Sequence, residues 1–316
     1  MLFFIEAVIS GLLAGVMYAL VALGFVLIFK ASEIFNFAQG VMCLFAALTL
    51  AGLILGYTPF AEILHTLGLP STWMPVFPLW LAIPLTIAVM IGLALLIERL
   101  ILRYLVNQEP IILFMATIGL AFVLEGIGDL MWGSDVKPLD IGLPSGASDW
   151  MLDSFDIYVE KLEVAAAVIA AILVVLLTLF SQYTRIGRAL RAVADDHQAA
   201  LSVGISLRTI WVIVWSIAGF VALVAGVMWG AKSGVQFSLS LIALKALPVL
   251  ILGGFTSIPG AIVGGLIIGV GEKVAEIYLG PFIGGALENW FAYVLALAFL
   301  LVRPQGLFGE RIIERV

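Results

Sequence analysis

Charge and cysteine are both scarce in this sequence. Charged residues make up 11% of the chain and its basic residues form no cluster, so a nucleic-acid-binding arm is excluded. The single cysteine, Cys43, lies in an apolar run, which excludes a disulfide framework and a thiolate metal site. There is also no Gly-x-x-x-x-Gly-Lys-Ser/Thr loop, so the chain is not expected to bind ATP. We expect no cofactor and no metal.

Apolar residues are abundant instead, at 63% of the chain with a mean hydropathy of +1.21. These values are far from the averages of soluble proteins. A membrane-spanning helix needs roughly 20 predominantly apolar residues. Such runs are expected near 5–29, 37–56, 75–97, 110–131, 162–181, 210–231, 240–254, 258–279 and 286–302. They are too long and too uniformly apolar for barrel strands, so the sequence predicts an all-α polytopic transmembrane helical bundle of about eight to nine spans, in one domain over residues 1–316.

The basic residues of the connecting loops indicate how the spans are oriented. One set of alternate loops, together with the C-terminus, carries ten of them, whereas the other set carries three. Because basic loops are retained in the cytoplasm, the 182–209 loop and the C-terminus are expected there. The acidic loop 132–161 is expected on the periplasmic side, and nine crossings would also place the N-terminus on that side.

Two segments leave the number of spans open. The run 37–56 is entered through the polar residues Asn36 and Gln39, and the run 241–254 is short and contains Pro248. Either segment could be a half-membrane or broken helix, which is tolerated where protein or a water-filled cavity satisfies the backbone. If the first were re-entrant, the N-terminus would lie inside. If only the run 241–254 were re-entrant, three arginines would lie on the periplasmic side, which disfavours that arrangement.

Glycine is frequent, with 32 residues, and three pairs are spaced by four positions. The pairs are Gly11 with Gly15, Gly260 with Gly264, and Gly265 with Gly269. Small residues at this spacing let helix backbones approach closely in lipid. They could serve packing within the chain, an interface with another subunit, or a moving helix pair.

The stretch 253–260 predicts a tight helical hairpin on the cytoplasmic side. Glycine permits unusual backbone dihedrals and proline stops helix continuation, although such residues also mark simple reversals. The candidate turn or hinge residues are Gly253, Gly254, Ser257, Pro259 and Gly260.

The loop 182–209 is polar and basic between two apolar runs. The sequence from Arg188 to Ala200 is rich in helix formers, and Gly204 can end the helix in a left-handed conformation. We expect a slim surface helix that could enter a groove on another protein, with polar contacts from its rim. A solvated charged loop is the alternative. The candidate rim residues are Arg188, Arg191, Asp195 and Asp196.

Several motifs together resemble one known family. The stretch Gln198-Ala199-Ala200, followed by Gly204, looks like the Glu-Ala-Ala-x-x-x-Gly loop of ABC importer permeases, with Gln in place of Glu. The stretch Asn36-Phe37-Ala38-Gln39-Gly40 resembles an Asn-Phe-Ala-His-Gly element of the branched-chain amino acid permeases, the LivH/LivM type. Residues 253–265 and the ending 304–309 resemble the same family. The resemblance runs essentially end to end and is nearest to the LivH type.

The resemblance implies a type II ABC importer fold and a multi-pass subunit of the bacterial inner membrane. It also implies a second permease subunit of the LivM type, two cytoplasmic ATP-binding subunits and a periplasmic substrate-binding protein, with membrane lipid around the spans. Residues 188–204 match the coupling helix, with Gln198, Ala199, Ala200 and Gly204 added to the rim residues as contacts of the ATPase. Closure of the ATPases can reset the pathway only through such a contact.

The solute is less constrained than the architecture. Gln39 replaces the histidine of the family element, and Val41 stands where an acidic residue often follows. Branched-chain or related amino acids are expected, with urea, short amides or aromatic acids as alternatives. Charged residues within spans are candidates for the pathway, because charge in hydrocarbon costs ~3 kcal/mol without a partner. The pathway candidates are Asn36, Gln39, Gly40, Lys245, Glu125 and Asp129.

Each of these candidates has a structural alternative. Lys245 could contact a substrate carboxylate or form an ion pair with one of the acids Glu125, Asp129, Glu272 and Glu276, the last two of which flank Lys273. Asn36 and Gln39 could cap a helix instead of lining a gate.

The sequence carries no enzyme signature. His65 and His197 lie on opposite sides of the membrane in the expected topology and cannot share a metal, and no histidine lies within a span to act as a base. ATP hydrolysis is therefore expected in partner subunits. A secondary transporter driven by an ion gradient is the remaining rival.

Overall fold

The structure is a computed structural model that describes residues 2–68, 70, 74–105, 108–195 and 197–309. These residues are mostly helical, and no β-strand is assigned among them; two isolated bridges join loops. Six helices are long and apolar enough to cross a membrane. Three shorter apolar segments accompany them, Gln39–Leu55, Phe237–Gly253 and Phe291–Val302. The predicted all-α polytopic bundle is confirmed.

The helices form two compact units. The first comprises Met1–Lys30, Leu143–Thr184 and Ile242–Val316, and the second comprises Ala31–Gly142 and Arg185–Leu241. The prediction of a single domain over the whole chain stays a prediction.

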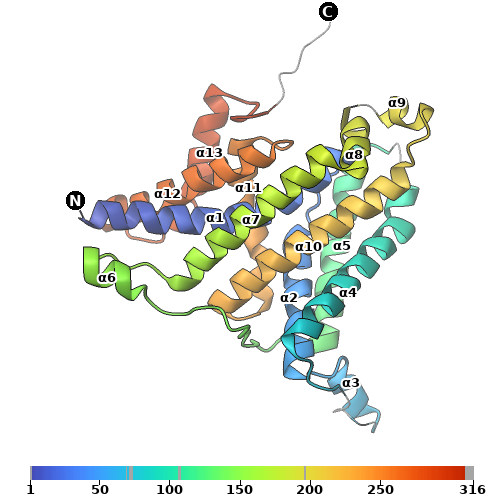
Figure 1. Ribbon diagram of the computed structural model, residues 1–316, viewed down its shortest axis with the longest axis horizontal. Helices are drawn as coiled ribbons and strands as arrows, with labels where there is room; N and C mark the ends of the chain where they lie inside the picture. The colour runs from blue at the N-terminus through green and yellow to red at the C-terminus, as the bar shows by residue number, and fades with distance from the viewer. Residues whose placement is uncertain (1, 69, 71–73, 106–107, 196, 310–316) are drawn as a thin grey trace, which may run out of the picture. The chain divides into compact units, whose positions relative to one another are not determined.

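The first unit contains the N-terminal helix α1 (Leu2–Ser32) up to Lys30 and the C-terminal helices of the chain (Figure 1). Helices α11 and α12 form a hairpin, and α13 packs on both of them. The Tyr293 hydroxyl on α13 donates a 2.7 Å hydrogen bond to the Leu244 carbonyl on α11. Besides α1, the elements of this unit are α6 (Asp149–Phe155), α7 (Lys161–Tyr183), α11 (Ile242–Gly253), α12 (Ile258–Ile283), the 3-10 turn Leu287–Asn289 and α13 (Phe291–Val302).

Glycines join α1 to α12 backbone to backbone. A Cβ on Gly11 would lie 2.7 Å from Val270 Cα and 2.8 Å from the Gly269 carbonyl oxygen. A Cβ on Gly265 would meet the carbonyl oxygen of Gly15 and lie 2.9 Å from Ala19 Cβ. The four-residue glycine spacing therefore serves packing within the chain, the first of the three roles left open.

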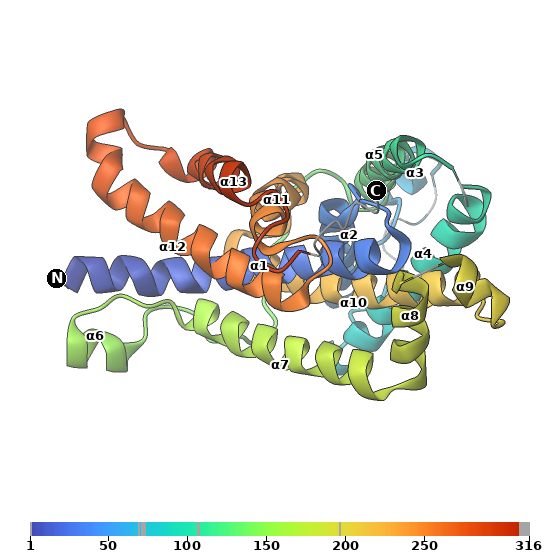
Figure 2. The same ribbon diagram turned by 90° about the horizontal axis from the view of Figure 1, so that it is seen from above.

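The second unit is built around α2 and α10, which cross and pack against each other (Figure 2). All residues of α2 from Gln39 to Leu53 are buried, and a Cβ on Gly226 of α10 would collide with the Cys43 carbonyl of α2. Helix α4 packs on α10 and α5 packs on α2. The elements are α2 (Gln39–Leu55), α3 (Ala61–Thr66), α4 (Leu79–Leu100), the turn Leu102–Tyr104, α5 (Pro110–Trp132), α8 (Arg185–Asp195), α9 (His197–Ser202), α10 (Leu207–Ser233) and the turn Phe237–Leu241.

Helices α11 and α13 are shorter than a membrane crossing. Each has 12 residues, so each is ~18 Å long against a hydrocarbon core of ~30 Å. The short α11 agrees with the alternative of a half-membrane or broken helix for 241–254, although Pro248 lies inside α11 and the 3-10 turn Phe237–Leu241 precedes it. The full span expected at 286–302 is wrong in its first part, because Ala286 has a φ of 54° and a 3-10 turn precedes the helix. The expected plain loop 132–161 also contains a helix, α6.

The α1–α12 contact yields a stability prediction. Gly265→Ala should lower the free energy of unfolding by about 1–3 kcal/mol, because the added methyl overlaps the α1 backbone and neither helix can move away freely. The measurement is a denaturation curve of the purified chain in detergent. Gly92→Ala is the matched control, since a Cβ on Gly92 of α4 has nothing within 4 Å. Equal stability of the two variants would contradict the contact.

Candidate functional site

In the basic loop the described residues form two helical stretches, α8 and α9, on either side of Asp196, and the prediction of one helix from Arg188 to Ala200 stays a prediction. Helix α8 ends at Asp195 and α9 begins at His197 (Figure 1). The two contact each other, and both pack against α10, so the segment belongs to the second unit. Asp196 lies outside the described residues, as does the side chain of Gln198, and the contacts predicted for them stay predictions.

The α8 helix has one buried face and one polar face. Gly187, Leu190 and Val193 recur at three-residue spacing and are buried, whereas Arg188 and Asp195 are exposed. Arg191 is half-buried at the edge. An amphipathic helix of this kind rests on its own protein and presents charge outward.

Helix α9 ends in a left-handed glycine, as the sequence predicts. Gly204 has a φ of 84°, its N–H donates to the Leu201 carbonyl at 3.0 Å, and the Ile205 N–H donates to the Ala200 carbonyl at 3.0 Å. These two hydrogen bonds form a Schellman motif, which satisfies the last carbonyls of the helix. The chain thereby reverses directly into α10.

The end of α9 exposes apolar side chains. Ala200 is buried, but Ala199 is exposed, and Leu201 and Val203 are 52% and 74% exposed. Sequence reasoning assigned contacts to the alanines and the charged rim and missed these two residues. Their position just before the terminating glycine was the available signal. An apolar tip beside a charged helix is suited to bind a groove on another protein.

The element Asn36 to Gly40 lies buried at the start of α2. The side chains of Asn36 and Gln39 are 0% exposed, and Gly40 is buried. Asn36 Oδ1 accepts the Ala38 N–H at 3.2 Å, and Asn36 Nδ2 donates to Gln39 Oε1 at 3.3 Å. The Asn36 side chain therefore shapes the turn that enters α2, but it does not cap the helix, because the N-cap residue is Ala38 and no side chain forms a capping hydrogen bond there. Within the described residues, Gln39 Nε2 has no hydrogen-bond partner.

Thr117 on α5 holds this entry turn in place. Its hydroxyl donates to the Phe35 carbonyl at 3.0 Å and accepts the Phe37 N–H at 3.1 Å. Phe35 and Phe37 also pack on Phe114, with ring centroids 5.7 Å and 6.0 Å away. Sequence reasoning missed Thr117, because a lone threonine in an apolar helix carries no periodic signal.

Lys245 is paired inside the first unit. Its Nζ lies 3.2 Å from Glu272 Oε1 on α12 and 3.5 Å from the Tyr18 hydroxyl on α1. The Glu272 side chain is 2% exposed, whereas that of Lys245 is 28% exposed. Glu272 is among the acids expected as ion-pair partners. The Lys245 side chain is therefore paired but not fully buried.

The other ionisable candidates separate into two places. On α12, Lys273 forms a 3.1 Å ion pair with Glu288, and Glu276 Oε2 accepts the Glu288 N–H at 3.0 Å. Glu125 and Asp129 belong to α5 in the second unit, where Asp129 is exposed and Glu125 half-buried. No group of three or more metal-binding side chains occurs among the residues described.

The hairpin turn between α11 and α12 is close-packed. A Cβ on Gly253 would collide with the Gly260 carbonyl, and Gly254 has a φ of 101°. Ser257 caps α12, because its Oγ accepts the Gly260 N–H at 3.0 Å, with Pro259 in the first turn. The predicted tight hairpin is confirmed.

The C-terminal motif packs on this turn. The Leu307 N–H donates to the Leu252 carbonyl at 2.8 Å, and the Phe308 N–H donates to the Gly253 carbonyl at 3.2 Å. Gly306 has a φ of 77°, and a Cβ there would lie 2.9 Å from the Gly254 nitrogen. Two motifs that the sequence presents 50 residues apart therefore form one structure.

Comparison with known proteins covers the same elements. The sequence model of the family described as "Branched-chain amino acid transport system / permease component" matches residues 7–303. The high-affinity branched-chain amino acid transport system permease protein LivH of Salmonella typhimurium is 29% identical, over 100% of this chain and 98% of its own length. BraD of Pseudomonas aeruginosa, described as a permease protein of the same kind of system, is 29% identical over 99% and 98%.

A third relative comes from an archaeon. The probable branched-chain amino acid transport permease protein LivH of Methanocaldococcus jannaschii is 27% identical, over 92% of this chain and 88% of its own. The matches span both units and every element described above. This chain therefore belongs to the branched-chain amino acid transport permease family of the inner membrane, and it is a transport subunit.

Proposed function

We propose that the chain is one permease subunit of an ABC importer that moves branched-chain or related amino acids across the bacterial inner membrane. ATP hydrolysis on two separate cytoplasmic subunits drives it, a second permease of the LivM type completes the pathway, and a periplasmic binding protein delivers the solute. The family match over residues 7–303 is the observation that carries this proposal. The family membership does not favour urea, short amides, aromatic acids or an ion-coupled mechanism.

The α8–α9 segment supports the coupling to ATPase subunits. It combines an exposed charged face with an apolar tip formed by Leu201 and Val203. The left-handed conformation of Gly204 sets the direction in which the chain continues from α9 into α10. The segment is packed on α10, which in turn packs on α2 and α4. A displacement of the tip by a partner is therefore transmitted through α10 to α2 and α4 in the second unit.

Lys245 is the proposed contact for the carboxylate of the solute. Glu272 supplies the opposite charge that makes the ammonium tolerable in hydrocarbon, and the Lys245 side chain is 28% exposed, which leaves room for an anion to approach. The same arrangement explains why a lysine can persist in α11 in the absence of solute.

The importer itself is tested by uptake. The chain reconstituted with its ATPase, second permease and binding protein should accumulate labelled leucine in liposomes only when ATP is supplied. Accumulation by the chain alone, driven by an ion gradient, would contradict the proposal.

Replacing the apolar tip should uncouple transport. The double variant Leu201→Asp, Val203→Asp should lower ATP-dependent uptake roughly tenfold, because a loss of about 1.4 kcal/mol at an interface weakens it by that factor. Uptake in the liposome assay and retention of the ATPase on the immobilised chain are both measured. Val136→Asp is the control for an introduced carboxylate, since it places one such group, against two in the double variant, at a valine of the 132–161 loop that is 58% exposed. Wild-type uptake and retention in the double variant would refute the coupling role.

The Lys245 pair allows its structural and solute roles to be separated. Lys245→Met leaves the Glu272 carboxylate without its cation and should cost about 3 kcal/mol of stability. Lys245→Met combined with Glu272→Gln removes both charges and should restore stability. If Lys245 contacts the solute, the double variant still transports poorly, with a raised KM for leucine. Normal uptake kinetics in the stable double variant would eliminate the solute role.

A further inference from the structure

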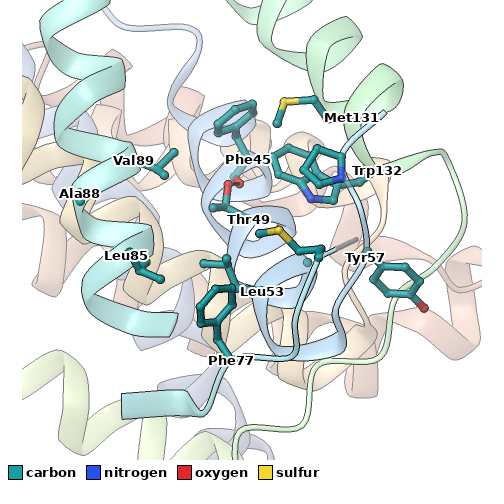
Figure 3. Close-up of a pocket in the computed structure, with 13 residues that line it drawn as sticks. Phe45, Thr49, Leu53, Tyr57, Phe77, Leu85, Ala88, Val89, Met131 and Trp132 are labelled. Carbon is teal, nitrogen blue, oxygen red and sulfur yellow. Dashed lines mark hydrogen bonds between the residues drawn. The ribbon is translucent and has the colours of Figure 1, made fainter. Parts of the chain in front are cut away.

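The second unit contains an apolar cavity of about 550 Å³ (Figure 3). It lies over α2, between α4 and the end of α5, and the loop that follows α2 closes one end. The Trp132 ring lies against Phe45, with centroids 5.3 Å apart, and against Gly52. Its lining is Phe45, Thr49, Gly52, Leu53, Tyr57, Pro59, Met74, Phe77, Leu85, Ala88, Val89, Met131 and Trp132.

A second, polar cavity shares a wall with the first. It has about 370 Å³, and Tyr57, Met131 and Trp132 line both cavities. Its polar lining includes Lys137 and Asp135. The two cavities together present a long apolar compartment with a charged compartment next to it.

Lys137 supplies the positive charge in the lining of the polar cavity. The residue is 2% exposed, and its Nζ donates to the Gly133 carbonyl at 3.3 Å and the Asp135 carbonyl at 3.1 Å. The Tyr57 ring lies 5.5 Å from the ammonium. In the part of the chain that the structure describes, no carboxylate forms an ion pair with it. A buried ammonium held by carbonyls and a ring, without a carboxylate in direct contact, is only partly compensated.

The pKa of Lys137 is shifted by this partly compensated burial. Burial lowers it below the usual value for lysine, and the negative charges of Asp135 and Asp129 raise it only in part. An anion placed in the polar cavity would favour the charged form and raise the pKa again.

The apolar cavity is lined by α4 and the end of α5, two apolar helices that are largely exposed on this chain. Only 28% of the span window of α4 is buried, and the same holds for α5. Among the lining residues, Val89 is 41% exposed on α4. An apolar cavity of this size does not hold water stably and is in the range that accommodates drug-sized ligands. One amino-acid side chain would fill a small part of it.

We propose that the paired cavities bind one membrane phospholipid, with an acyl chain in the apolar cavity and the phosphate beside Lys137. Tyr57 and Trp132 stand at the junction, the position that aromatic side chains occupy at the membrane interface. The lipid comes from the leaflet on the side of the 132–161 loop. This site goes beyond the proposed transport function and does not depend on it, because neither Lys137 nor the cavity belongs to the residues proposed for coupling or solute contact.

Photo-crosslinking tests the site. The full chain, with the subunits that copurify with it, is placed in nanodiscs containing phosphatidylglycerol, phosphatidylethanolamine or diacylglycerol, each with the same diazirine-bearing acyl chain. Peptides that line the cavity should be labelled by both phospholipids and roughly tenfold less by diacylglycerol, the ratio expected for a loss of about 1.4 kcal/mol. Mass spectrometry of the peptides gives the readout.

Two variants sharpen the result. Ala88→Trp fills the cavity from an exposed position and should abolish labelling by the phospholipids, whereas Leu95→Trp, an exposed residue of α4 outside the cavity, should not. Lys137→Met should remove the preference for phospholipid over diacylglycerol. Because Lys137 is buried, the Ala88→Trp comparison stands even if Lys137→Met does not fold.

Three outcomes would overturn the proposal. One is equal labelling by phospholipid and diacylglycerol in the wild-type chain. Another is unchanged labelling in Ala88→Trp. The third is labelling that occurs only when the chain is separated from its partner subunits, which would assign the cavity to a protein segment.

Discussion

Close approach of helix backbones holds each unit together, and most of the local structure depends on it. Lipid offers no hydrophobic drive for helices to associate, so the contact itself must supply dispersion energy. In the first unit α1 meets α12 at Gly15 and Gly265, and in the second α10 meets α2 where Gly226 faces Cys43. Any side chain at these positions would separate the helices.

The same constraint shapes the functional elements. The hairpin 253–260 can be tight only because Gly253 and Gly260 touch, and this proximity creates the surface on which residues 306–308 hydrogen-bond. Lys245 reaches Glu272 because α11 and α12 are adjacent in that hairpin. A structural requirement for small residues thus places the one lysine of α11 beside a carboxylate and keeps the charge tolerable in the membrane.

Much of the fold could be predicted from the sequence, because long apolar runs and helix-ending glycines are local signals. The spans and the left-handed Gly204 follow from such signals. The shortened α13 was missed, although Glu288 and Asn289 in the 3-10 turn before it are polar and were an available local signal. The roles of Tyr18 and Thr117 could not be predicted, for another reason. Their roles depend on which helix packs next to which, and a single hydroxyl in an apolar helix carries no pattern.

The contact between α1 and α12 also has a consequence for biosynthesis. Gly15 and Gly265 are about 250 residues apart, and at typical synthesis rates the second emerges tens of seconds after the first. During that interval the glycine face of α1 lies in the membrane without its partner helix. Assembly of the first unit is therefore a late event that joins the beginning of the chain to its end, and α1 needs a temporary neighbour, lipid or insertion machinery, until α12 arrives.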